Sequence, residues 1–301
     1  MRTSVPSLAL AVFLILSSAG AAAAEPLAFK PGDTLEEIRY KIDYNGYSFT
    51  VGHNRIFDMT PAEKAAFFAR RFPRAPRSRA VSDDLGPLAR QLGRTALPSS
   101  FDWRSYNGHS YIGAVRDQGD CGSCYSFGAC GAAEGTYNFA NGLYGSNCID
   151  FSESYIIWCL GRLSQYEEHF YGCNGADWDY MELEALTRQG IILESAFPYR
   201  ESDTGSCTHW SDHTYAFQSW HRITCNDTNA IKTAIMTYGP VDASVDVDTG
   251  FEAYDSGVYQ NTSTTCPPDP EIGSECYHTY TNHAISLVGW DDSPPEGGAA
   301  F

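Results

Sequence analysis

Residues 118–127 read Gln-Gly-Asp-Cys-Gly-Ser-Cys-Tyr-Ser-Phe, and this stretch decides how the rest of the chain is interpreted. Small and aromatic residues follow it at helical spacing and end at Asn141-Gly142, which predicts a helix that begins at or near Cys124. A thiol at the N-terminus of a helix feels the positive end of the helix dipole, which favours the thiolate, the attacking species. The backbone N–H groups of the first helical turn can also face a developing oxyanion. The stretch therefore predicts a nucleophilic cysteine at position 124.

Other uses of a Cys-x-x-Cys pair predict a different sequence context. A thioredoxin-like site should lie early in a small βαβ unit, and a zinc site should have a second such pair or a His pair at finger spacing. The sequence has neither pattern. A disulfide exchange protein would also require Cys121 to be a free thiol.

Three further segments make the chain resemble the papain family of cysteine proteases. Residues 172–176 read Gly-Cys-Asn-Gly-Ala, residues 281–290 place His283 at the start of an aliphatic run, and residues 97–104 look like the opening of the family's mature enzyme. The C-G-[SA]-C-[WY] signature around Cys124 is characteristic of this family. The resemblance implies that Cys124 is the nucleophile.

The same resemblance implies the remaining site residues. His283 would be the catalytic partner of Cys124, and Gln118 would help to hold the oxyanion. Residues expected to bind substrate are Gly175, Ala176, Asp177, Trp178, Ser244, Asn282 and Ala284. Ala176 stands where the family has glycine, so its methyl group is expected to narrow the groove. No metal or other cofactor is expected.

The ten cysteines suit an export pathway, where disulfides persist. The resemblance implies the pairs Cys121–Cys173 and Cys159–Cys207. Cys130–Cys148 and Cys266–Cys276 are suggested by proximity alone, and Cys225 is left over.

Three regions are expected along the chain. Residues 1–24 have the charged start, short apolar core and alanine-rich end of a signal peptide, so we expect a secreted or lysosome-like or vacuole-like location and no membrane contact after signal removal. Residues 25–97 are expected to be a shortened propeptide with a linker, and residues 98–301 a papain-like peptidase domain. Residues 52–60 resemble a family propeptide motif, and only a remnant of the family's longer helical motif lies at 36–45. Because the propeptide is shortened in this way, its inhibition of the peptidase domain is expected to be weaker or differently built.

The expected fold class is α+β, with a helical left domain, an antiparallel β-barrel-like right domain and the active-site cleft between them. Helical patterns lie at 123–141, 152–163 and 177–189. Strand patterns lie at 241–247, 257–260 and 284–290.

Charge is unevenly divided along the chain. From Pro98 onward there are 28 acidic and 7 basic residues, a net charge of −21. Such a body excludes nucleic-acid binding on electrostatic grounds. The arginine-rich stretch 70–94 is expected to be an exposed, cleavable linker whose positive charge attracts the acidic body. The expected partners are peptide or protein substrates and the chain's own propeptide, with the enzyme a monomer.

The function that fits these features is a cysteine endopeptidase made as a zymogen. The alternative is a catalytically impaired papain-fold fragment or binding protein. It stays open because the family's Asn-Ser-Trp segment, whose asparagine orients the histidine, has no counterpart after Gly289-Trp290. On this ground we expect the chain to be a truncated form of a longer protease.

Overall fold

The computed structural model describes residues 25–68, 97–177, 180–203, 206–207, 214–223, 227–260 and 281–293. The expected signal peptide, the arginine-rich linker, Trp178, Cys225, Cys266 and Cys276 lie outside these residues. The helices are α1 (Leu35–Asn45), α2 (Arg55–Asp58), α3 (Pro61–Phe67), α5 (Cys124–Asn141), α6 (Met181–Gln189), α7 (Thr228–Tyr238) and α8 (Thr249–Glu252). The short helical turns are η1 (Gly145–Asn147), η2 (Tyr155–Cys159), η3 (Leu160–Arg162) and η4 (Gly172–Asn174). The strands are β1 (Thr50–Val51), β2 (Ser100–Asp102), β3 (Val241–Val245), β4 (Tyr254–Ser256), β5 (His283–Leu287) and β6 (Gly289–Asp291).

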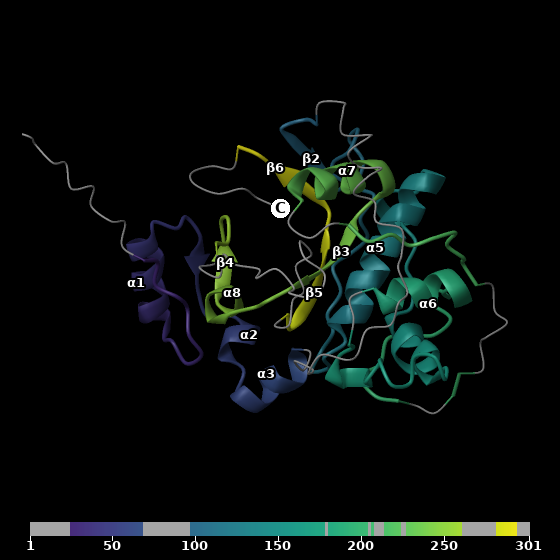
Figure 1. Cartoon of the computed structure of the whole chain (residues 1–301), viewed down its shortest axis with the longest axis horizontal. Helices are drawn as coiled ribbons and strands as arrows, with labels where there is room; N and C mark the ends of the chain where they lie inside the picture. The colour runs from purple at the N-terminus through teal and green to yellow at the C-terminus, as the bar shows by residue number, and fades with distance from the viewer. Residues whose placement is uncertain are drawn as a thin grey trace, which may run out of the picture.

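Helix α5 is the central element, and it packs against the antiparallel pair β3–β5 (Figure 1). Of three glycines in α5, Gly128 and Gly131 face this pair, and Gly135 faces Pro240, directly before β3. A Cβ at Gly128 would lie 2.3 Å from the Asp242 carboxylate, and one at Gly131 would lie 2.4 Å from the Ser286 hydroxyl. The absence of side chains at these positions lets the helix backbone approach the strands closely. Gly142 then ends α5 in the left-handed conformation, as predicted.

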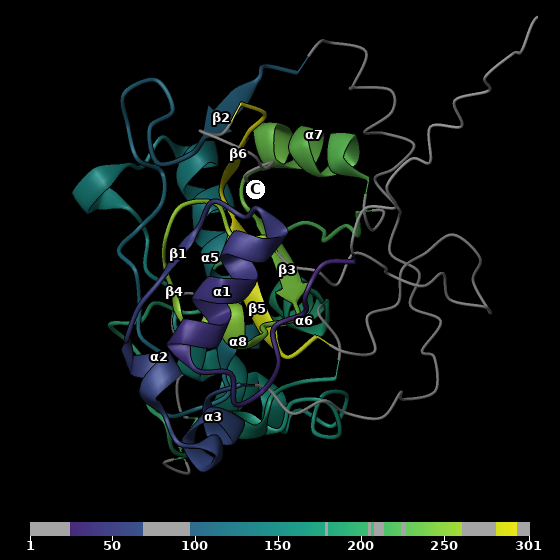
Figure 2. The same ribbon diagram turned by 90° about the vertical axis from the view of Figure 1, so that its left-hand side faces the viewer.

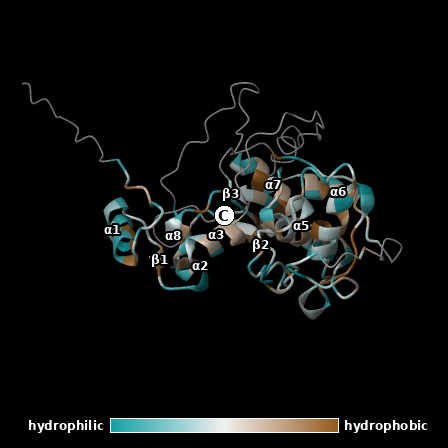
Figure 3. Ribbon diagram, turned by 90° about the horizontal axis from the view of Figure 1, so that it is seen from below, coloured by the Kyte–Doolittle hydropathy of each residue, from teal (hydrophilic) through white to brown (hydrophobic). Residues whose placement is uncertain are grey.

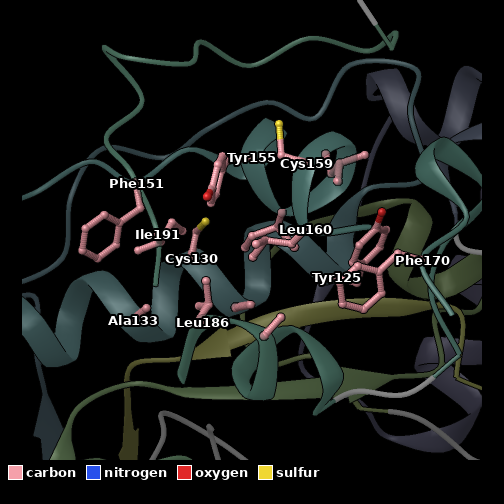
Figure 4. Close-up of a cluster of buried hydrophobic side chains, with 14 of the residues drawn as sticks. Tyr125, Cys130, Ala133, Phe151, Tyr155, Cys159, Leu160, Phe170, Leu186 and Ile191 are labelled. Carbon is pink, nitrogen blue, oxygen red and sulfur yellow. The ribbon is translucent and has the colours of Figure 1, made fainter. Parts of the chain in front are cut away.

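The other side of α5 covers the largest hydrophobic core (Figure 4). Tyr125, Cys130 and Ala133 project from α5 toward side chains of η2, α6 and the connecting loops. The fully buried members from those parts include Phe151, Tyr155, Ile156, Leu160, Leu186 and Ile191. Burying a side chain of this size stabilises the fold by about 1.5–3 kcal/mol each. This core holds together the helical half of the molecule.

The β half is built on a second core beside β2, β6 and α7. Strands β2 and β6 pair antiparallel, with Phe101 opposite Trp290. Trp103, Ile235 and Trp290 are buried together there. The indole N–H of Trp103 donates to the backbone oxygen of Ile235, 2.9 Å away, so this buried donor is satisfied. Figure 2 shows α7 beside β2 and β6.

The N-terminal segment, residues 25–68, forms a third core with a distant part of the chain. Strand β1 pairs antiparallel with β4, and Phe29, Ile38, Phe49 and Ala253 are buried in one cluster. A capping box at Thr34 starts α1, whose surface is mostly hydrophilic (Figure 3). In Figure 1 α1 and α2 of this segment lie with α8 and β4 on the side of the molecule away from α6, whereas α3 lies below them and contacts η4. It therefore docks through a shared hydrophobic core.

The structure corrects three expectations. Residues 257–260 are not a strand, because the chain turns at Gly257, whose φ is +94° and whose Cβ position lies 2.9 Å from Phe49 Cα; the strand there is β4. Residues 152–163 form a π-helical and a 3₁₀ turn where one regular helix was expected. Cys130 and Cys148 are not joined. Cys130 is buried in the core beside α5, whereas the Cys148 sulfur lies 3.7 Å from the backbone oxygen of Ser110.

No helix among the residues that the structure describes is long and apolar enough to cross a membrane.

Candidate active site

Cys124 is the first residue of α5, as the sequence predicts, and its side chain is buried. Both disulfides that the resemblance implied, Cys121–Cys173 and Cys159–Cys207, are present. The first ties the turn before α5 to η4, and the Gly122 N–H donates to the Cys173 backbone oxygen at 3.0 Å. Cys124 itself is outside these disulfides. A disulfide exchange pair with Cys121 is therefore not formed, because Cys121 is bonded to Cys173.

Gln118 is buried beside Cys121, and its amide is held in a defined direction. Its Nε2 donates to the backbone oxygen of Cys121 at 2.8 Å and to that of Phe67 at 2.9 Å. The hydroxyl of Tyr199 donates to the Gln118 backbone oxygen at 2.7 Å and lies 2.8 Å from the Ser123 hydroxyl. Burial raises the pKa of Tyr199 to about 12, so the hydroxyl keeps its proton at any working pH. Tyr199 thus holds both ends of the turn before α5, through its hydrogen bonds to Gln118 and to Ser123.

His283 begins β5, opposite Val245 of β3. Because β5 packs against α5, the imidazole is brought to the same region as the N-terminus of α5. Burial lowers its pKa from 6.5 to about 4. Its Nδ1 is buried, and among the described residues it has no hydrogen-bond partner. The ring is therefore neutral at physiological pH in this structure.

The N-terminal segment covers this site with the end of α3. The Phe67 ring stacks on the His283 ring at 6.1 Å between centroids, and the Phe68 ring meets it edge-on at 5.7 Å. The backbone of the segment also passes close to Gly122, where a Cβ would lie 3.1 Å from the Ala66 oxygen. A side chain at position 122 would clash first with the Cys173 backbone oxygen, 2.6 Å from the Cβ position, and would also crowd the segment. The glycine therefore permits the close approach.

The predicted groove residues that the structure describes lie in two places. Gly175, Ala176 and Asp177 follow η4, whereas Ser244, Asn282 and Ala284 lie in or directly beside β3 and β5. Ala176 lies opposite Phe170 in an antiparallel bridge, whose hydrogen bonds run from Tyr171 N to Gly175 O and from Asp177 N to His169 O. In such a pair, the backbone N–H and C=O groups of the bridging residue point away from its partner. The backbone of Ala176 therefore presents an edge to which an extended peptide could add.

Asp177 has a structural role that the sequence did not reveal. Its carboxylate oxygen lies 3.0 Å from His169 Nδ1 and accepts from the Tyr171 hydroxyl at 3.1 Å. Burial, together with the neighbouring carboxylate of Asp177, raises the pKa of Tyr171 to about 12. At least one oxygen of Asp177 is thus used within its own loop.

Ser244 and Ala284 are cross-strand partners in β3 and β5, and the Ala284 methyl lies 3.3 Å from the Cβ position of Gly128. They therefore lie next to the first turns of α5. Asn282 bonds through its amide to both backbone groups of Val247, accepting at 2.8 Å and donating at 3.1 Å. Its side chain joins the ends of the two strands.

Sequence reasoning missed Phe67, Phe68 and Tyr199 as parts of the site. The two phenylalanines lie far from the catalytic motifs in sequence, and only the fold brings them onto His283. Among the described residues, no group of His, Cys, Asp or Glu is arranged to hold a metal ion.

Comparison with known proteins agrees with the fold. Residues 97–297 match the model described as "Papain family cysteine protease". The chain belongs to the papain family of cysteine proteases. It is a cysteine-type peptidase with the α+β papain fold, so the expected family, fold class and enzyme class are confirmed.

Similar members of the papain family include digestive and cathepsin proteins. Digestive cysteine proteinase 2 of Homarus americanus is 29% identical over 278 residues, covering 89% of this chain and 73% of that protein. A cathepsin L-like proteinase of Fasciola hepatica is 28% identical over 260 residues, covering 85% and 69%. The structure of digestive procathepsin L2 proteinase from Tenebrio molitor larval midgut superposes with a TM-score of 0.68 at 25% identity, covering 88% of this chain and 76% of that one.

Proposed function

We propose that this chain is a cysteine endopeptidase made as a zymogen, in which Cys124 attacks the scissile carbonyl and His283 moves the proton. The observation that carries the proposal is the convergence of three elements. Cys124 begins α5, the Gln118 amide is fixed beside Cys121, and β5 carries His283 against α5.

The reaction follows from the chemistry of these groups. The Cys124 thiolate adds to the carbonyl carbon, and the electron pair moves to the oxygen, where the Gln118 amide and the backbone N–H of Cys124 stabilise the charge. Collapse of the intermediate breaks the C–N bond, and the His283 imidazolium gives its proton to the leaving amine. Water then adds to the thioester with His283 as the base, which releases the acid and restores the thiol–imidazole pair.

The N-terminal segment is proposed to be the inhibitory part of a propeptide spanning residues 25–97. The carbonyl oxygen of Phe67 accepts a hydrogen bond from the Gln118 amide, the group that would bind the substrate oxyanion. The Phe67 and Phe68 rings cover His283 at the same time. Substrate therefore cannot reach the three catalytic groups until the segment leaves. The solved relatives that include procathepsins and a bromelain precursor support a fold with such a segment.

The remaining assignments fit an exported peptidase. We propose that residues 1–24 are a signal peptide and that residues 98–301 form the peptidase domain, which acts as a monomer in a secreted or lysosome-like compartment. The two disulfides support an oxidising environment. Gly175, Ala176, Asp177, Trp178, Ser244, Asn282 and Ala284 are proposed to line the substrate groove.

Substitution of the two cysteines of the motif separates catalysis from folding. Cys124→Ala should abolish peptide hydrolysis, because no other group supplies the nucleophile. Cys121→Ala should instead lower stability, since loss of a native disulfide costs about 2–5 kcal/mol. Hydrolysis rates of the processed enzyme and thermal unfolding of the full chain measure the two effects. A Cys124→Ala protein that hydrolyses peptides at the wild-type rate would disprove the assignment.

A further inference from the structure

Two carboxylates flank Gln118 in the sequence and hold a cation in the structure. Arg55 of the N-terminal segment donates from Nη1 to both oxygens of Asp117, at 2.9 and 3.2 Å, and from Nη2 to Asp120 Oδ1 at 2.8 Å. One planar guanidinium therefore bridges two carboxylates, which is the arrangement that suits arginine best.

This cation lies next to the catalytic groups. The guanidinium carbon of Arg55 is 6.0 Å from the centroid of the Phe67 ring. The same ring stacks on His283, and the Phe67 backbone oxygen accepts from Gln118 Nε2. The Phe67 ring thus lies against both the Arg55 guanidinium and the His283 imidazole.

The carboxylates belong to the proposed peptidase domain, where the Asp117 carboxylate and the Asp120 backbone are held independently of Arg55. Asp117 Oδ1 accepts from the Gly119 N–H at 2.9 Å, and the Asp120 N–H donates to Glu201 Oε2 at 2.9 Å. The backbone hydrogen bond from Gly119, followed by the contacts with Arg55, lowers the pKa of Asp117. The side chains of Asp117 and Asp120 remain 74% and 69% exposed. They are accessible to a ligand from solvent.

We propose that Asp117 and Asp120 form a cation subsite of the mature peptidase, filled by Arg55 in the zymogen and by an arginine or lysine side chain of the substrate after the N-terminal segment is removed. This assignment rests on the proposed function, because it gives a substrate class to the same active site. Removal of Arg55 leaves like charges next to each other without their cation. A basic side chain of a bound peptide restores the two ion pairs.

The test is a peptide series cleaved by the full chain after processing. Each peptide carries arginine, lysine, glutamine or glutamate at one position, and the position is moved along both sides of the cleaved bond. At one position kcat/KM should be about three- to tenfold higher for arginine than for glutamine, since two exposed ion pairs are each worth little. The preference should shrink as salt is raised, because exposed charges are screened.

Variants assign the preference to these residues. Asp117→Asn/Asp120→Asn should lose it, and the asparagine oxygen at 117 can still accept from Gly119. The control Glu167→Gln/Glu168→Gln removes two exposed charges from the loop between η3 and η4 and should keep it. Asp120→Lys should favour glutamate over arginine at the same position, which provides a gain of function that a misfolded protein could not show.

The outcomes distinguish this inference from the function beneath it. Equal cleavage of the arginine and glutamine peptides at every position would overturn the cation subsite and leave the peptidase intact. A preference for arginine that survives the Asp117→Asn/Asp120→Asn change would also overturn it. Absence of cleavage of any peptide, together with an unreactive Cys124, would overturn the proposed function and the subsite with it.

Discussion

At the scale of single residues, the contacts of His283 show how the proposed active site can be kept inactive. The imidazole is neutral because burial lowers its pKa to about 4. A general acid must carry a proton, and a thiolate is stabilised by a neighbouring imidazolium. In the proposed mechanism the rings of Phe67 and Phe68 therefore do more than block substrate, because they cover the proposed base, His283, and favour its uncharged form.

Because burial lowers the pKa of His283, the stability of the folded zymogen depends on pH in a defined direction. Between pH 6.5 and about 4 the unfolded chain binds a proton at His283 that the folded zymogen does not, so zymogen stability is lost as the pH falls through this window. At about 1.4 kcal/mol per pKa unit, the loss amounts to about 3 kcal/mol. We expect faster release of the segment and faster processing at pH 4–5 than at pH 7.

NMR titration of His283 in the inactive Cys124→Ala full chain checks this expectation. The His283 pKa should be near 4, and Phe68→Ala should raise it by exposing the ring. His221, which is also partly buried but does not contact the segment, serves as the internal control. A His283 pKa above 6 in the intact zymogen would contradict the account.

At the scale of elements, the site depends on how closely α5 approaches β3 and β5. The sequence predicts the start of α5 at Cys124 and its end at Gly142 because helix dipole, spacing and stop signals agree there. The strand containing His283 could be predicted because an aliphatic run follows the histidine and ends at Gly289-Trp290. The approach of α5 to the strands could not, because its three glycines have a meaning only once the partner strands are known.

Substitution of Gly128 tests this packing. Gly128→Ala should destabilise the fold by about 1–2 kcal/mol, since overpacking costs about 1–3 kcal/mol and alanine recovers up to about 1 kcal/mol in helix propensity. Its Cβ would lie 2.3 Å from the Asp242 carboxylate. Gly52→Ala is the matched control, because nothing lies within 4 Å of the Cβ position there. Chemical denaturation of both variants gives the comparison, and equal stability would show that α5 does not need the glycine.

The same limit explains the other differences between sequence and structure at this scale. The pairs Cys121–Cys173 and Cys159–Cys207 were implied by resemblance and are present, whereas Cys130–Cys148 rested on proximity in sequence and is absent. Cys130 faces the core because of its place on α5, which proximity in sequence does not reveal. The coverage of His283 by Phe67 depends on contacts across more than 200 residues.

At the scale of the whole molecule, acidity shapes both docking and stability. The arginine-rich stretch 70–94 lies outside the described residues, so its expected attraction to the acidic body stays a prediction. Two other cations of the N-terminal segment do reach the body: Arg55 pairs with Asp117 and Asp120, and Lys64 pairs with Glu252 at 2.6 Å. The hydrophobic core shared with Ala253 adds a term that salt does not screen.

A buried group of carboxyls sets the stability at higher pH. Burial, together with neighbouring acids, raises the pKa values of Glu134 and Glu153 to about 8. Both are protonated in the folded state at pH 5 and ionised in the unfolded state above their ordinary pKa of 4.5. The stability that they contribute is therefore present below pH 4.5 and is lost as the pH rises through 8.

Replacement of Glu134 by glutamine should reduce this alkaline loss. Glutamine keeps the oxygen that accepts from the Phe151 N–H at 2.7 Å, and it removes one ionising group. We expect the fall in Tm between pH 5 and pH 8 to be smaller in Glu134→Gln than in the wild type. Glu167→Gln, an exposed position, should leave the fall unchanged. An identical fall in Glu134→Gln would show that Glu134 does not contribute.

The central claim is that Cys124 is the nucleophile and that the N-terminal segment shields it. The most direct measurement is mass spectrometry of the full chain after treatment with a peptidyl epoxide that alkylates active-site thiols, before and after acid processing. The account predicts one label, on Cys124 and not on the free thiols Cys130 and Cys148, and labelling that is fast only after the segment is removed. An unlabelled Cys124 in the processed enzyme, or equally fast labelling of the intact zymogen, would contradict it.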